Sequence, residues 1–108
     1  MNIEQCVYDI LFARTLRISP TSKIQKDGNF YLGTNATLGK IMSLNNLAGE
    51  ICLSCDGSSN IGSIFGKFKD LYPAVSDDLL KFDICRCISD LERLGMIESI
   101  PAVNKEVN

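Results

Sequence analysis

Cysteine is the residue type in this sequence whose number and spacing could do chemistry, because the chain contains five cysteines and no histidine. Cys52 and Cys55 stand three residues apart just before Asp56-Gly57, and Cys85 and Cys87 follow later in the chain. Thiolates at such spacing are common zinc ligands, and a four-thiolate site needs both pairs to converge on one ion. The first question is therefore whether the two pairs can meet.

The apolar spacing around both pairs favours core packing over metal binding. Cys52 and Cys55 share one helical apolar stripe, where a free cysteine behaves as a small hydrophobe. Cys85 and Cys87 are separated by about 200° around a helix, at about 100° per residue. We therefore expect Cys52, Cys55 and Cys87 to be buried and free of metal, with Asp56-Gly57 as the hinge between two helices. No cofactor is implied.

Composition limits the chain to a small globular domain. Its 108 residues, 45% of them hydrophobic, suffice for one modest core. No apolar run approaches the eighteen or so residues of a membrane span, and the N-terminus does not resemble a signal peptide. An odd number of cysteines without an export signal predicts reduced thiols and a cytoplasmic location. Without histidine we find neither a nucleophile–base arrangement nor a glycine-rich phosphate loop, so we expect no enzyme activity.

Charge is unevenly distributed along the chain. Residues 1–44 contain five basic and three acidic residues (net +2), whereas residues 45–108 contain six basic and ten acidic residues (net −4). This asymmetry favours an acidic partner for the first part.

The first 44 residues predict mainly strands. Residues 1–16 fit a short helix or a strand equally well, and residues 22–33 read as a hairpin around Asp27-Gly28, a type I′ turn signal. Lys40–Leu44 is a third strand, in which Met42 and Leu44 face one side and Ile41 and Ser43 the other.

The second half predicts three helices, because the apolar period changes to helical after residue 44. Their limits follow from capping and breaking residues. One helix begins at Asn45 or Asn46 and ends at Gly57, a second is capped by Asn60 and stopped by Pro73, and a third begins at Ser76 and ends at Gly95.

An ordered set of core, cap and turn residues resembles the PqqD-like family, the peptide-binding domains known as RiPP recognition elements. RiPPs are ribosomally made, post-translationally modified peptides. The resemblance covers about residues 20–98, and Asn60 stands where the family most often has threonine. The matching positions are Leu44-Asn45, Ala48, Ile51, Cys55-Asp56-Gly57, Asn60, Ile61, Ile64, Ile88, Leu91, Gly95 and Met96-Ile97.

The resemblance implies a fold and a domain organisation. The fold is α+β and winged-helix-like, with a three-stranded antiparallel sheet packed on three helices. Residues 1–19 form an N-terminal segment without assigned structure, residues 20–98 the peptide-binding domain, and residues 99–108 a polar tail.

The resemblance also implies a non-catalytic function. Such domains hold the leader region of a precursor peptide and present the peptide to a modifying enzyme, often a radical SAM maturase. The leader is added as a strand along the third strand, against the third helix. Phe82 lies opposite the buried face of that helix and predicts an exposed contact. The expected peptide-binding residues are Lys40, Ile41, Met42, Ser43, Leu44, Phe82, Cys85, Arg86 and Ser89.

Two alternatives remain at the level of the sequence. A winged-helix DNA-binding regulator would use the third helix for recognition, yet that helix has three basic and five acidic residues (net −2), the wrong sign for phosphate. A small regulatory subunit would have much the same sequence. We expect neither a nucleic-acid nor a membrane partner.

Overall fold

The computed structural model describes residues 12–100 and contains two antiparallel sheets and three helices in that range. One sheet has the strand order β2-β3-β4 and the other the order β5-β1-β6. The elements in chain order are β1 (Thr15–Ile18), β2 (Ser22–Asp27), β3 (Phe30–Asn35), β4 (Lys40–Leu44), α2 (Asn46–Ser54), β5 (Asp56–Asn60), α3 (Ile61–Leu71), α4 (Asp77–Arg93) and β6 (Ile97–Ile100). The α+β, winged-helix-like fold class is confirmed.

The sheet β2-β3-β4 is the predicted three-stranded sheet, and its hairpin differs from the prediction by one residue. Asp27 pairs with Phe30, so the two turn residues are Gly28 and Asn29. Gly28 has φ +63° and Asn29 does not have a positive φ. A positive φ at the first turn residue alone is the pattern of a type II′ turn, so the predicted type I′ turn centred on Asp27-Gly28 is wrong.

The second sheet, β5-β1-β6, was not predicted. Thr15–Ile18 is a strand between β5 and β6, so Thr15 and Leu16, the last residues of the segment for which helix and strand were predicted equally, are in a strand. Residues 1–11 lie outside the described part. Leu16 in β1 is fully buried in the core. The predicted boundaries after residues 19 and 98 therefore fall between β1 and β2 and inside β6, and residues 101–108 lie outside the described part.

The three helices begin at the predicted caps. The side chain of Asn45 accepts the Ala48 N–H at 2.8 Å, and that of Asn60 accepts the Ser63 N–H at 2.8 Å. Ser76 caps α4 through the Leu79 N–H at 3.2 Å. These side chains satisfy N–H groups that have no partner within the helix. Among residues 12–100, no helix has both the length and the apolar composition to cross a membrane.

The Asp56-Gly57 pair forms part of a strand rather than a bare hinge. The first helix ends at Ser54 and not at Gly57, where the sequence predicted its end. Gly57 has φ +87° and lies in β5, where the pairing with β1 shifts register between Thr15 and Arg17. The Asp56 carboxylate accepts the N–H groups of Ser58 and Ser59 at 2.9 and 2.8 Å, which lowers its pKa to about 2. The Asp56 side chain therefore supplies hydrogen-bond partners for backbone N–H groups of this polar strand, which leads from α2 into α3.

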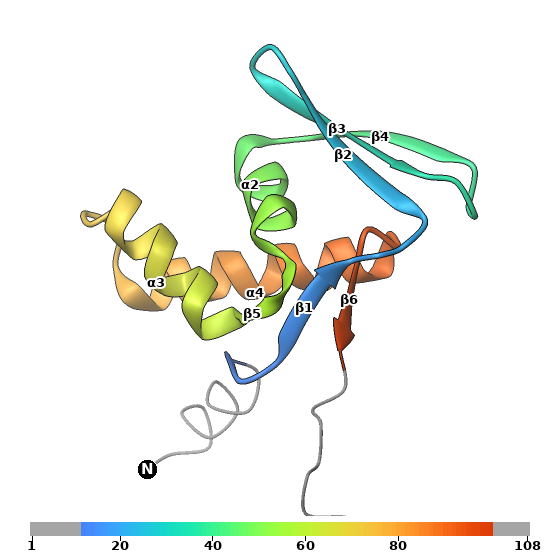
Figure 1. Ribbon diagram of the computed structural model, residues 1–108. Helices are drawn as coiled ribbons and strands as arrows, with labels where there is room; N and C mark the ends of the chain where they lie inside the picture. The colour runs from blue at the N-terminus through green and yellow to red at the C-terminus, as the bar shows by residue number, and fades with distance from the viewer. Residues whose placement is uncertain (1–11, 101–108) are drawn as a thin grey trace, which may run out of the picture.

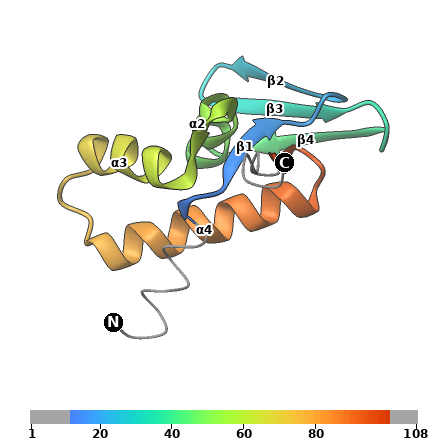
Figure 2. The same ribbon diagram turned by 60° about the horizontal axis from the view of Figure 1, so that its bottom comes forward.

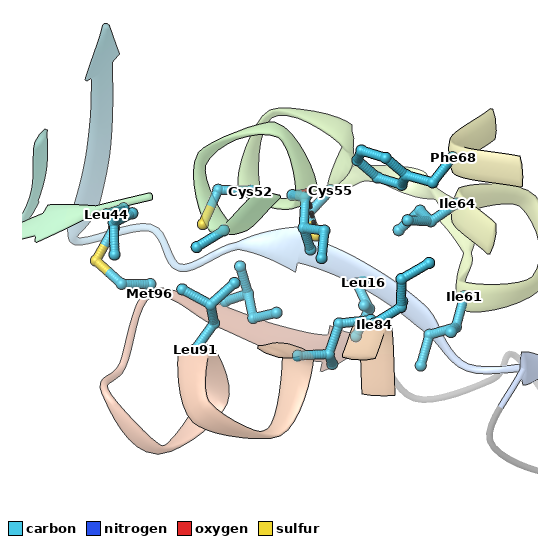
Figure 3. Packing of buried hydrophobic residues seen from close by; sticks show 14 of the residues in the cluster. Leu16, Leu44, Cys52, Cys55, Ile61, Ile64, Phe68, Ile84, Leu91 and Met96 are labelled. Atoms are coloured by element: carbon cyan, nitrogen blue, oxygen red, sulfur yellow. Dashed lines mark hydrogen bonds between the residues drawn. The ribbon is translucent and has the colours of Figure 1, made fainter. Parts of the chain in front are cut away.

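A single core joins the two sheets to the helices (Figure 3). Figure 2 shows α4 running along one side of the molecule, with α3 and the β2-β3-β4 sheet above it. In Figure 1 this sheet extends away from α2 at the upper right. The sheet packs against α2 at Gly49, where a Cβ would lie 2.1 Å from the Tyr31 ring, so only glycine permits this approach. The core thus fixes β4 relative to α2 and α4.

Candidate functional site

The thiols belong to the core rather than to a reactive centre. Cys52 and Cys55 are 0% and 3% exposed, which confirms their predicted burial, whereas Cys87 is only partly buried. Burial raises the pKa of Cys52 and of Cys55 to about 12 and that of Cys87 to about 11. Such thiols are protonated near neutral pH, whereas the thiolate is the nucleophilic form of cysteine. No group of three or more potential metal ligands occurs within residues 12–100.

Strand β4 leaves one of its edges open. It pairs with β3 on one side, and the described residues place no strand on the other. The register of the sheet determines which backbone groups point toward this open edge. The two-residue loop of the β2–β3 hairpin makes Asp27 and Phe30 a hydrogen-bonded pair. Every second pair along an antiparallel ladder is of that type, and the bond from the Ala36 N–H to the Thr21 carbonyl, 2.9 Å long, fits the same alternation.

Continuing this alternation across β3 identifies the open groups of β4. The β3 residues that face β4 are Tyr31, Gly33 and Asn35, and they pair with Leu44, Met42 and Lys40. The N–H and C=O groups of Ile41 and Ser43 therefore point away from β3, toward the open edge. An additional strand can pair there without displacing an existing one.

The side chains of β4 alternate as predicted. Leu44 is buried and Met42 packs against the core, whereas Ile41 and Ser43 are exposed, Ile41 to 77%. An open edge strand with an exposed aliphatic side chain can pair with another chain, and only the charge of Lys40 opposes such pairing within β4. The edge thus combines free backbone groups with apolar surface.

A groove of about 330 Å³ lies between the end of β4, the start of α2 and one flank of α4. We call it the β4 groove. Its lining is mainly apolar, and Asp83, Arg86 and Asp90 of α4 supply the charge. Within the described part, Arg86 makes no ion pair and Asp90 pairs with Arg93. The lining residues are Leu44, Asn45, Leu47, Ala48, Asp83, Arg86, Cys87, Asp90, Leu91 and Leu94.

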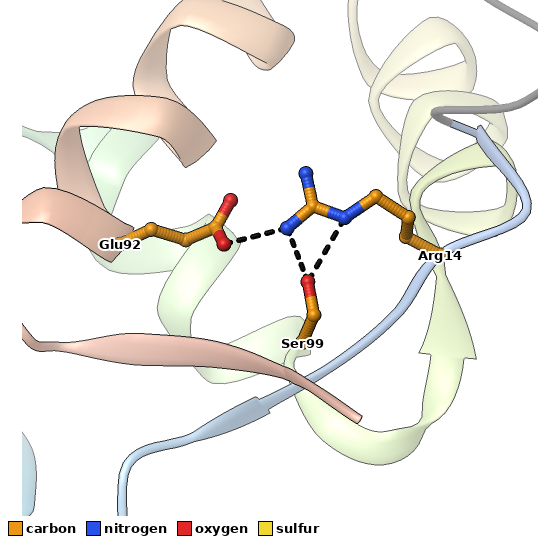
Figure 4. A network of polar contacts seen from close by, with 3 residues as sticks. All are labelled: Arg14, Glu92 and Ser99. Atoms are coloured by element: carbon orange, nitrogen blue, oxygen red, sulfur yellow. Dashed lines mark hydrogen bonds and ion pairs between the residues drawn. The ribbon is translucent and has the colours of Figure 1, made fainter. Parts of the chain in front are cut away.

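The opposite flank of α4 is closed by a polar network. Arg14 donates to Glu92 Oε2 at 2.5 Å and through Nε to Ser99 Oγ at 2.9 Å, which ties α4 to β6 and to the residues before β1 (Figure 4). A smaller hollow of about 230 Å³ beside this network is lined by Arg14, Ile61, Cys85, Ile88, Ser89 and Glu92. We call it the Arg14 hollow.

No protein-family model and no curated protein sequence matches this chain. Among solved structures, the one described as TbiB1 in complex with the TbiA(beta) leader peptide is similar in fold, with a TM-score of 0.69 at 13% sequence identity. The match covers 80% of this chain and 99% of that chain. The likeness is one of fold, and the narrower resemblance to the PqqD-like family stays a prediction from the sequence.

The predicted site residues are divided between the two flanks of α4. The structure brings Leu44 of β4 and Arg86 of α4 together in the β4 groove, whereas Cys85 and Ser89 line the Arg14 hollow. Phe82 is exposed, as predicted, at 55%, and it lines neither hollow. The binding roles of these residues stay a prediction.

Sequence reasoning missed the apolar lining of the groove. Leu47 and Leu94 were not among the predicted site residues, yet both are partly buried and line the β4 groove. Their positions near helix ends could have indicated partial exposure. Leu47 stands two residues after Asn45, the N-terminal cap of α2, and Leu94 is the C-terminal cap of α4.

Proposed function

We propose that this domain binds the leader region of a ribosomally made precursor peptide as an additional strand on the open edge of β4, and presents the peptide to a modifying enzyme. The domain itself performs no catalysis in this proposal. The observation that carries it is the open edge of β4, where the backbone groups of Ile41 and Ser43 point outward, with the β4 groove at the Leu44 end of the same strand.

The two parts of the site have different tasks. Backbone hydrogen bonds to Ile41 and Ser43 supply affinity that does not depend on the peptide sequence. Alternate side chains of an added strand point to the same face as Met42 and Leu44, and they enter the groove lined by Leu47 and Leu94. Their apolar surface is removed from water there, which gives specificity for an aliphatic or aromatic residue.

Two comparisons support the choice of a leader peptide as ligand. The fold is similar to that of a protein solved with a leader peptide bound, and the sequence resembles a family of leader-binding domains. That family frequently serves radical SAM maturases, so an enzyme of this type is the partner we propose. Because a flexible peptide loses entropy when it becomes ordered, we expect a dissociation constant of about 0.1–10 μM.

The test removes the edge donors one at a time. Ile41→Pro and Ser43→Pro each eliminate an N–H that faces outward, so the ladder between β3 and β4 keeps its hydrogen bonds. We expect each variant to bind a labelled leader peptide, taken from a precursor encoded beside this gene, about 5- to 50-fold more weakly, the loss expected for an unmade backbone hydrogen bond. Fluorescence anisotropy measures the change.

Lys26→Pro is the matched control. Lys26 occupies the same alternating position on β2, so its N–H faces the other edge of the same sheet. We expect this variant to bind the leader as tightly as the wild type. Equal weakening by all three proline variants would indicate damage to the sheet rather than a site at β4, and full binding by Ile41→Pro and Ser43→Pro would contradict the proposal.

A further inference from the structure

The two ends of β4 open onto hollows of different chemistry. The Leu44 end meets the β4 groove, and the Lys40 end meets a hollow of about 420 Å³ that we call the Lys40 hollow. Four residue steps of about 3.3 Å separate Lys40 from Leu44, so the two hollows are about 13 Å apart along the edge. The residues that line the Lys40 hollow are Thr21, Lys23, Thr34, Asn35, Ala36, Gly39, Lys40 and Ile41.

The Lys40 hollow is basic. Lys23 pairs with Thr34 and Thr34 with Ile41, so these three residues form one row across the sheet, and Lys40 stands at its edge. Within the described residues, neither Lys23 nor Lys40 forms an ion pair. The hollow contains no acidic residue among its lining. Lys40 is on the open strand itself and Lys23 is two strands away on β2, and ammonium groups at this end of the sheet favour a carboxylate.

The β4 groove has the opposite preference. Its lining contains two carboxylates, Asp83 and Asp90, against one cation, Arg86, in otherwise mainly apolar surroundings. A carboxylate of a ligand is disfavoured there, and an apolar side chain is favoured. The edge of β4 therefore runs from a basic end to an apolar end with a small negative charge.

We propose that a peptide on this edge places an acidic residue in the Lys40 hollow and an apolar residue, three or five positions away, in the β4 groove, because Ile41 and Leu44 face opposite sides of the sheet. This inference rests on the proposed function and adds the substrate class to it. An edge strand can pair in either direction. Because the two hollows differ, the order of the acidic and apolar residues in the peptide fixes the direction of the bound strand.

Selection from a displayed library of random twelve-residue peptides tests this without a known precursor. The wild-type protein is expected to enrich peptides with Asp or Glu three or five positions from an aliphatic or aromatic residue, always in the same order. Lys23→Glu and Lys40→Glu are each expected to weaken an enriched acidic peptide about two- to fivefold at low salt, the range for exposed charge pairs. Lys67→Glu, an equal charge change on α3, is the matched control and is expected to have no effect.

The outcomes separate this inference from the proposed function. The enriched peptides could fail to bind Ser43→Pro and yet show no preference for an acidic residue, or contain the acidic and apolar residues in both orders equally often. Either result would overturn the inference and leave strand addition intact. If no peptide is enriched, or if the enriched peptides bind Ser43→Pro at full strength, strand addition on β4 fails and the inference fails with it.

Discussion

The two flanks of α4 are built from the same helix and differ in what covers them. The flank with Asp83, Cys87 and Leu94 lines the β4 groove together with Leu44, at the end of β4. The other flank, about half a turn around the helix, is fastened to β6 through Arg14 and Ser99. Their linings contain similar residue types: a partly buried cysteine, a buried aliphatic residue and a carboxylate on each side.

The difference shows that residue type alone does not make a binding surface on a helix. Cys85 and Cys87 are two residues apart, yet Cys85 lines the Arg14 hollow and Cys87 lines the groove at the end of the open strand β4. What distinguishes the open flank is the neighbouring strand edge, which is a property of the tertiary structure.

The largest expected effect comes from placing a carboxylate in each of the two hollows beside α4 in turn. Leu47→Asp puts an unpaired carboxylate into the apolar part of the β4 groove and is expected to reduce leader affinity by about 2 kcal/mol or more. Ser89→Asp makes the corresponding change at the exposed rim of the Arg14 hollow and is expected to change affinity by less than about 0.5 kcal/mol. Isothermal titration calorimetry measures both, and a thermal melt confirms that each variant is folded. Weaker binding by Ser89→Asp alone would assign the site to the other flank.

The closed flank is expected to contribute stability instead of binding. Arg14→Ala removes the hydrogen bonds to Glu92 and Ser99 and is expected to lower the free energy of unfolding by about 1–2 kcal/mol, with leader affinity unchanged. Arg17→Ala removes a more exposed ion pair, to Glu98, and serves as the control, with a loss within about 0.5 kcal/mol. Urea denaturation compares the two. A loss of leader binding in Arg14→Ala would contradict the separation of roles.

The smallest expected effect is a change in thiol reactivity. Cys87 lines the β4 groove and Cys85 the Arg14 hollow. Because burial raises the pKa of Cys87 to about 11, its thiolate fraction and alkylation rate should rise about tenfold per pH unit between pH 7 and 10. Bound leader is expected to slow alkylation of Cys87 by N-ethylmaleimide about three- to tenfold, as peptide covers the groove, and to leave Cys85 unaffected. Mass spectrometry locates the adducts, and equal protection of both thiols would break the comparison.

The elements with strong local signals could be predicted from the sequence. Asn45, Asn60 and Ser76 were identified as helix caps, and the alternation of Lys40–Leu44 identified β4 with its buried and exposed faces. Each of these signals arises from interactions within a few residues of the chain.

The second sheet could not be predicted, because its strands are stabilised by distant partners. Asp56–Asn60 has the sequence DGSSN, with no apolar alternation, and it becomes a strand only by pairing with β1. Ile97–Ile100 has four residues and likewise depends on Thr15–Ile18. Long-range pairing of this kind overrides local propensity.

The candidate site could be predicted only in part, because it also depends on contacts between distant parts of the chain. The apolar stripe of α4 shows which face is buried, and the residues opposite it, such as Phe82, were taken as the contact face. In the proposed binding mode, a peptide strand added to β4 would instead lie against one flank of α4. The path of the chain through α2 and α3 determines which flank of α4 lies near β4. The apolar periodicity of α4 therefore cannot predict that flank.

Amide hydrogen exchange along β4 tests strand addition most directly. In the free protein we expect slow exchange at Met42 and Leu44, whose N–H groups bond to β3, and fast exchange at Ile41 and Ser43. Saturating leader peptide should slow Ile41 and Ser43 selectively, by about tenfold or more, because their N–H groups then donate to the peptide backbone. Bound peptide that leaves the exchange of Ile41 and Ser43 fast would contradict binding at this edge.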